Sequence, residues 1–153
     1  MDTGRYSLIQ AEVRAQLDEI ESVYRRIDSR RQAAGDPGVE SLAYQLHNLY
    51  SAFEDLFRVV AEAFENNIAI DGGYHIALPR RMMVSVPGVR PALIDRQAYE
   101  LLDSLRGFRH LFRHAYGTRL DPRKVKIVLE DADALRSRYE KLMEKFLLAV
   151  APE

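Results

Sequence analysis

The chain has 153 residues, 47% of them apolar, which is the size and composition of one domain with a hydrophobic core. Basic and acidic residues nearly balance, at 22 and 23, and there are no cysteines, so a disulfide scaffold, a thiolate metal site and a cysteine nucleophile are excluded. No apolar run approaches the roughly 20 residues that span a bilayer, and no apolar segment of a signal peptide follows the N-terminus. We therefore expect a single cytoplasmic domain over residues 1–153, with no membrane contact.

Apolar residues recur at helical spacing in four parts of the chain, and each series places one apolar stripe on one helical face. The series are Val13, Leu17, Ile20, Tyr24 and Ile27; Leu46, Leu49, Phe53, Leu56, Val60 and Ala63; Leu101, Leu105, Phe108, Phe112 and Ala115; and Val125, Val128, Ala132, Leu135, Tyr139, Leu142 and Phe146. No segment shows sustained alternation with β-branched residues, so no strand is predicted. Short connections favour antiparallel neighbours, and the sequence predicts an all-α, up-down four-helix bundle.

Turn and cap residues separate the four series. Gly35-Asp36-Pro37-Gly38 is expected to form the turn between the first two helices. Gly117 stands where a left-handed glycine would end the third helix. Asp121-Pro122 has the pattern of an N-cap followed by proline at the first position of the fourth helix.

Residues 68–94 interrupt the pattern between the second and third helices. Asp71-Gly72-Gly73 ends the second helix, and a short helical turn is expected over residues 79–83. Further long helices are prevented by prolines, namely Pro79, Pro87 and Pro91. A connection this long in a small bundle is usually functional. It can equally be a lid over the bundle end, with its apolar side chains packed inside: Ile76, Leu78, Met82 and Met83.

Basic residues are concentrated in one part of the chain. Residues 71–124 carry a net charge of +5, whereas residues 1–70 carry −5. Between residues 106 and 124, six Lys or Arg and two His accompany a single acid, Asp121. Such a patch can hold phosphates even though the whole chain is nearly neutral. The alternative is a solvated face whose charges are balanced by acids brought near by folding.

The end of the third helix carries the side chains best suited to catalysis or ligand binding. At about 100° per residue, two polar stripes lie side by side, one of Arg109, Arg113 and Tyr116, the other of Arg106, His110, Arg113 and His114. A zinc site is disfavoured: the two histidines have zincin-like i, i+4 spacing, but no Glu follows His110 and the arginines would repel a dication. A solvated face without a function is a second interpretation.

Phosphodiester chemistry is the third interpretation of this cluster. An arginine can bind a nonbridging phosphate oxygen and offset the charge that develops there. A histidine can move a proton to or from a ribose 2′-hydroxyl or the leaving oxygen. Together they suffice to cleave RNA without metal or another cofactor, because RNA supplies its own nucleophile.

The motif Arg109-His110-x3-His114-x-Tyr116 resembles the signature of HEPN domains, and the tyrosine two residues after the histidine is the form found in HepT-like toxins. The resemblance runs from about residue 45 to 125, and Pro79 departs from it because the family tends to keep that stretch helical. Its blocks are Gly73-Tyr74-His75, Arg80-Arg81-Met82, Val86-Pro87-Gly88-Val89-Arg90-Pro91, Leu105-Arg106-Gly107-Phe108-Arg109-His110 and Asp121-Pro122.

The resemblance implies a metal-independent endoribonuclease toxin of a type II toxin–antitoxin pair, acting on tRNA or mRNA. Arg109 and His114 would be catalytic, with His110 and Arg113 supporting them, in a cleft shared by a homodimer or a larger hetero-oligomer. The cognate MntA-type nucleotidyltransferase antitoxin would add AMP to Tyr116. The alternative is a non-catalytic HEPN module that binds nucleotide or a nucleotidyltransferase.

Other residues are secondary candidates. His75 either reaches the cleft or packs, whereas His47 is expected to be a surface or satisfied histidine. Tyr44 and Tyr50 are expected to pack rather than to stack on RNA. Candidate phosphate contacts, with a solvated face as the alternative, are Arg80, Arg81, Arg90, Arg106 and Arg119.

Overall fold

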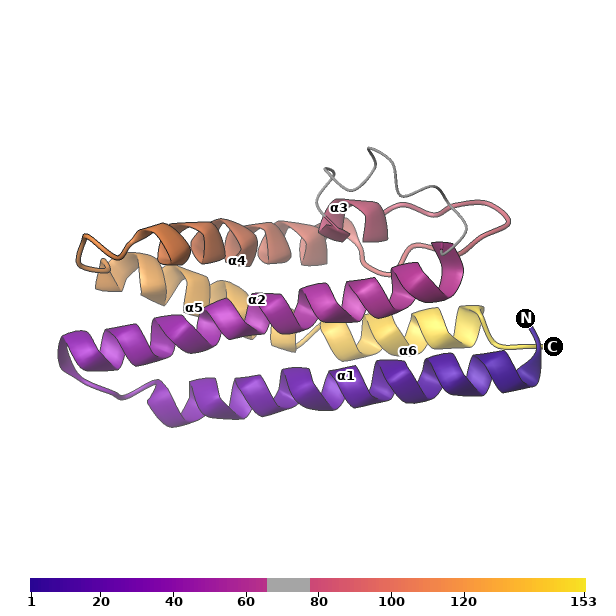
Figure 1. Ribbon diagram of the computed structural model, residues 1–153, viewed down its shortest axis with the longest axis horizontal. Coiled ribbons are helices and arrows are strands. Elements are labelled where there is room, and N and C mark those ends of the chain that lie inside the picture. Colours follow the sequence, from indigo (N-terminus) through magenta and orange to yellow (C-terminus); the bar gives the residue numbers. More distant parts are fainter. Residues whose placement is uncertain (66–77) are drawn as a thin grey trace.

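The computed structural model describes residues 1–65 and 78–153. Within these residues the helices are α1 (Thr3–Arg30), α2 (Gly35–Glu65), α3 (Leu78–Met82), α4 (Arg96–His114), α5 (Pro122–Arg136) and α6 (Tyr139–Ala149). The long helices α1, α2 and α4 alternate in direction, and α5 followed by α6 forms the fourth column (Figure 1). The predicted all-α, up-down bundle is therefore confirmed. Both termini lie at one end of it, and the C-terminus of α4 lies at the other.

Aspartate caps start three of the helices. Asp2 accepts a hydrogen bond from the backbone N–H of Arg5 at α1, and Asp95 accepts one from Ala98 at α4. Asp121 does the same for α5, where Pro122 is the first helical residue. Each cap satisfies an N–H that has no partner inside the helix. The predicted cap at Asp121-Pro122 is confirmed.

The turn predicted over Gly35–Gly38 is misplaced. It lies at residues 31–34, and Gly35, with a φ of +71°, already begins α2. Pro37 fits in the first helical turn because the N–H it lacks would have no helical partner there. A Cβ on Gly38 would lie 2.5 Å from the carbonyl carbon of Ala33. The chain therefore needs a glycine at this close approach rather than in the turn itself.

The predicted fourth helix is two helices. α5 ends at Arg136 and is followed by Ser137, whose hydroxyl donates to the carbonyl of Ala134 over 2.8 Å. After this break α6 begins at Tyr139, whose ring lies parallel to Tyr24 at 5.9 Å and edge-on to Phe53 at 5.3 Å. The break is hidden in the sequence because the apolar spacing continues across it.

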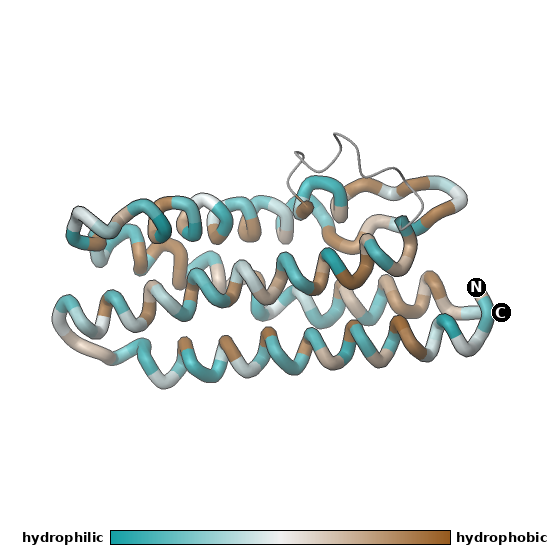
Figure 2. Tube along the Cα trace, in the orientation of Figure 1, coloured by the Kyte–Doolittle hydropathy of each residue, from teal (hydrophilic) through white to brown (hydrophobic). Residues whose placement is uncertain are grey.

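The core forms where the apolar stripes of all four columns meet. Hydrophobic and hydrophilic bands alternate along the helices, as expected for amphipathic elements (Figure 2). The largest fully buried side chains include Tyr24, Tyr50, Phe53, Phe57 and Phe146. Tyr24 keeps its buried hydroxyl satisfied by donating to the carbonyl of Ala132 over 2.7 Å. In the described parts of the chain, no helix has both the length and the apolar character needed to cross a bilayer.

The segment that joins α3 to α4 packs on the core. Met82 is fully buried, and Leu78 and Met83 pack against the same core. The carbonyl of Met82 accepts hydrogen bonds from the backbone N–H groups of Leu93 and Ile94. The short helix predicted over residues 79–83 is confirmed within one residue as α3, and the predicted lid packing is confirmed for these residues. Ile76 lies outside the described residues.

Candidate active site at the end of α4

The predicted catalytic motif occupies the last turns of α4. Leu105 and Phe108 on the same helix are buried, while His110, Arg113 and His114 are exposed and Arg109 is half-buried. His110, Arg113 and His114 therefore face away from the buried apolar side of α4. The motif therefore lies on the surface, at the end of the bundle opposite the chain termini (Figure 1).

Arg109 is held against α2. Its Nη1 lies 3.1 Å from Oε2 of Glu54, and its guanidinium carbon lies 5.3 Å from the ring centre of Tyr50. Glu54 also pairs with Arg58, one turn further along α2, at 2.6 Å. These contacts fix the direction of the guanidinium while using one of its five N–H donors.

Tyr50 supports this contact from the core side. It is buried, as predicted, and burial together with the charge of Glu54 and a hydrogen bond to it raises the pKa of Tyr50. The hydroxyl therefore stays neutral at physiological pH. Tyr50 and Glu54 lie four residues apart, on one face of α2. The sequence analysis did not select Glu54, because its role depends on the packing of α2 against α4.

The two histidines of the motif lie together on another side of α4. The ring centres of His110 and His114 are 4.6 Å apart, which confirms that these residues share a stripe. The side chain of Arg109 instead points to α2, so one chain does not gather Arg109 and His114 around a single point. Arg113 has no ion pair within residues 1–65 and 78–153, which leaves a positive charge beside the motif.

Three of the other candidate arginines lie on the surface. Arg106 pairs with Asp103 at 2.7 Å, and Arg119 pairs with Asp36 at 2.9 Å. Both pairs are largely exposed, and such pairs contribute little, about 0–1 kcal/mol. Their arginines can therefore exchange an acid for a phosphate. Arg80 is also exposed, on α3.

Arg90 is not available to a ligand, and the prediction that it contacts RNA phosphate is wrong. Its side chain is 1% exposed and pairs with Glu65 at 2.7 Å. It also donates to the carbonyls of Val84, Pro91 and Arg81, so it joins the 81–91 segment to the end of α2. Arg81 shares Glu65 with it and is partly buried.

Tyr116 lies outside α4. The helix ends at His114, and the N–H of Ala115 donates to the carbonyl of Phe112 over 3.4 Å. The expected left-handed glycine cap is absent, since Gly117 does not have a positive φ. The spacing predicts that Tyr116 continues the stripe of Arg109 and Arg113, but the helix ends before it. Tyr116 is 95% exposed. His75 lies outside the described residues.

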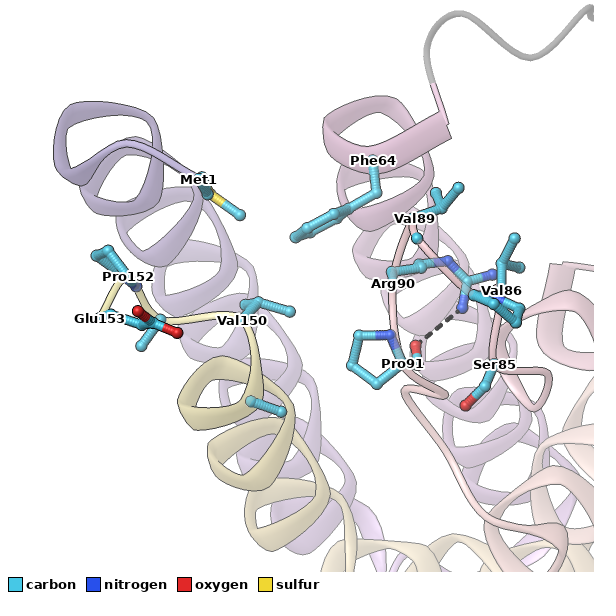
Figure 3. A pocket seen from close by; sticks show the side chains of 14 residues that line it. Met1, Phe64, Ser85, Val86, Val89, Arg90, Pro91, Val150, Pro152 and Glu153 are labelled. Carbon is cyan, nitrogen blue, oxygen red and sulfur yellow. Dashed lines mark hydrogen bonds between the residues drawn. The ribbon is translucent and has the colours of Figure 1, made fainter.

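A pocket of about 770 Å³ lies at the opposite end of the bundle, near the two chain termini. Figure 3 shows Met1, Val150 and Pro152 on one side of it, and Phe64 and Val89 on the other. Arg90 also lines it, but its guanidinium is already hydrogen-bonded within the fold. The pocket is thus remote from the motif, and its lining offers mainly apolar side chains.

The described residues contain no group of three or more His, Cys, Asp or Glu that could hold a metal ion. The side chains gathered at the end of α4 are arginines and histidines instead. Arginine side chains can bind phosphate, and histidine side chains can transfer a proton near neutral pH. This set is suited to acid–base chemistry on a phosphate ester.

Comparisons with known proteins agree with the motif. A family model described as HepT-like protein matches residues 41–150, from the first turns of α2 to the end of α6. The comparison with curated proteins finds no match. The comparison with solved structures finds none either. Since the family model covers more than half of the chain, the protein belongs to the HepT-like family.

Proposed function

We propose that this protein is a metal-independent endoribonuclease, the toxin of a type II toxin–antitoxin pair. The observation that carries the proposal is the motif Arg109-His110-x3-His114 on an exposed helix end in a HepT-like chain. RNA supplies the 2′-hydroxyl that such chemistry needs as a nucleophile. The side chains of the motif supply charge and proton transfer, which are the two remaining requirements.

The reaction divides between the two catalytic side chains. Arg109 binds a nonbridging oxygen of the scissile phosphate and offsets the negative charge of the transition state. The 2′-oxygen forms a bond to phosphorus and loses its proton, while the bond from phosphorus to the 5′-oxygen breaks and that oxygen gains a proton. His114 carries out one of these two proton transfers. The products end in a 2′,3′-cyclic phosphate and a 5′-hydroxyl.

A homodimer brings the required residues together. Arg109 points toward α2, whereas His114 lies beside His110 at the exposed end of α4. Around a two-fold axis, the same surface patch of a second chain faces the first. His114 of one chain can then approach a phosphate that Arg109 of the other chain binds. Arg113 and His110 add charge and orientation to this shared cleft, and exposed Arg80, Arg106 and Arg119 extend its contacts to phosphates.

Cleavage in the presence of a chelator tests the proposed chemistry. The purified protein is expected to cut single-stranded RNA equally well with and without excess EDTA, because no step uses a metal ion. The 2′,3′-cyclic phosphate ends are detected by mass spectrometry of the products. Loss of cleavage in EDTA contradicts the mechanism, and RNA binding without cleavage in any buffer favours the non-catalytic alternative.

Tyr116 is the proposed site of control by a nucleotidyltransferase. Its hydroxyl is accessible, since the side chain is 95% exposed just beyond α4. Attack of this hydroxyl on the α-phosphorus of ATP forms a tyrosyl phosphodiester and releases pyrophosphate. The added nucleotide brings a negative charge next to His114 and Arg113, where it competes with RNA phosphate.

Tyr116→Phe is expected to keep the fold and the nuclease activity, yet to resist inhibition by the cognate nucleotidyltransferase and ATP. Intact-mass spectrometry should show one added AMP on the wild type and none on the variant. Tyr99→Phe, a change to a tyrosine within α4, serves as the control and should be modified like the wild type. Equal modification and equal inhibition of Tyr116→Phe would place the modified residue elsewhere.

A further inference from the structure

An aromatic group, formed by exposed Tyr44 and half-buried His47 and Phe112, lies beside the motif where α2 packs against α4. The rings of Tyr44 and His47 are parallel within 7°, with centres 6.4 Å apart. The ring centre of Phe112 lies 5.3 Å from that of His47 and 6.5 Å from that of Tyr44. Tyr44 packs against the rings of His47 and Phe112, as expected, but it is also 53% exposed.

The group is partly carried by a helix that is anchored in the core. Its residues on α2 alternate with Leu46 and Leu49, which are fully buried and anchor the helix. The Nδ1 of His47 lies 3.4 Å from the side-chain oxygen of Asn48, which helps to hold the ring. A flat surface that is already ordered loses little conformational entropy on binding.

The surrounding charges favour a polyanion. The positive charges of Arg109 and Arg113 act on His47, and Tyr44 is one turn of helix from it. Burial, with these charges in addition, lowers the pKa of His47 despite the contact with Asn48. The ring is therefore neutral at pH 7 and presents an uncharged face. A neutral aromatic face beside arginines is the combination that single-stranded RNA-binding proteins use, with bases stacked on rings and phosphates held by cations.

We propose that Tyr44 and His47 form a stacking platform for an unpaired nucleobase of the RNA whose phosphates Arg109 and Arg113 bind. This inference rests on the proposed function and adds a base-binding subsite to it. Stacking uses the π-face that every base has, so the platform selects unpaired RNA over duplex RNA and tolerates different bases. The phenol of Tyr44 provides the accessible face, and His47 and Phe112 support it.

The test measures binding of two non-cleavable oligonucleotides to the full-length protein. Both carry 2′-O-methyl groups and the same number of phosphates, and one of them has abasic sites in place of its central bases. Tyr44→Ala is expected to weaken binding of the base-bearing oligonucleotide about tenfold, and to leave the abasic one unchanged. Tyr44→Phe, which keeps the ring, should bind like the wild type. Leu8→Ala removes another exposed apolar side chain, on α1, and serves as the control.

The other outcomes overturn the platform. If Tyr44→Ala weakens both oligonucleotides equally, or neither, no base stacks on Tyr44. If it instead changes the mass of the protein in light scattering, the aromatic group is covered by a second copy of the chain. Cleavage of unmodified RNA, measured in parallel, separates the two proposals. If the wild-type protein cleaves RNA and Tyr44→Ala binds both oligonucleotides as the wild type does, only the platform is refuted. If the wild-type protein neither cuts nor binds RNA, the proposed function is refuted as well.

Discussion

Replacing His114 with alanine is expected to lower the rate of RNA cleavage by about 100-fold or more, because one proton transfer loses its positioned donor or acceptor. His114 is exposed at the end of α4, so the free energy of unfolding should change by less than about 0.5 kcal/mol. Arg109→Ala should lower the rate by a similar factor, since an unbalanced phosphate charge costs about 10²–10³-fold. Single-turnover cleavage and urea unfolding measure the two effects separately.

The two variants should differ in stability. Arg109→Ala also removes the contact with Glu54 and the packing over Tyr50, so it should unfold more readily than His114→Ala. Arg96→Ala is the matched control, because Arg96 lies at the other end of the same helix with a side chain that is 81% exposed. Full activity in both motif variants, or an equal loss in Arg96→Ala, would contradict the assignment.

Breaking the buried pair between Arg90 and Glu65 is expected to have the largest effect on stability. Arg90→Met leaves the carboxylate of Glu65, which is 5% exposed, with Arg81 as its one remaining cationic partner among the residues that the structure describes. Removing one partner of a buried pair typically costs about 3–5 kcal/mol. The change also leaves the carbonyls of Val84 and Pro91 without their donor. Urea unfolding followed by circular dichroism should therefore show a clearly lower midpoint.

An exposed pair provides the comparison. Arg96 and Glu100 on α4 are 3.6 Å apart and mostly exposed, so Glu100→Gln should shift the unfolding free energy by about 0.5 kcal/mol at most. An unchanged midpoint in Arg90→Met would show that the 81–91 segment does not depend on this arginine for its attachment to α2. Arg90 would then have a role other than holding this segment on α2.

Local signals in the sequence were enough to predict most of the fold. The apolar spacing predicts the long helices, and Asp121-Pro122 marks the start of α5. The end of α4 and the break at Ser137 were not predictable, because both leave the apolar spacing intact. The start of α2 at Gly35 depends on the close approach of Gly38 to Ala33, which is a tertiary contact.

The site was predictable as a motif but not as an arrangement. The sequence identifies Arg109, His110 and His114 because their chemistry and spacing are local to one helix. It does not reveal that Glu54, on another helix, holds Arg109. It also treats Arg90 like the other arginines, although Glu65 binds it inside the fold. The roles of these two arginines depend on acidic partners that only folding brings near.

The shared cleft is tested most directly by mixing two inactive chains. Arg109→Ala and His114→Ala are co-expressed, so that some dimers contain one copy of each. If Arg109 of one chain acts with His114 of the other, each mixed dimer has one intact site, and the mixture should recover about a quarter of wild-type cleavage. Each variant alone should remain inactive. A mixture as inactive as its components, in dimers shown to be mixed by mass spectrometry, would contradict a site that two chains share.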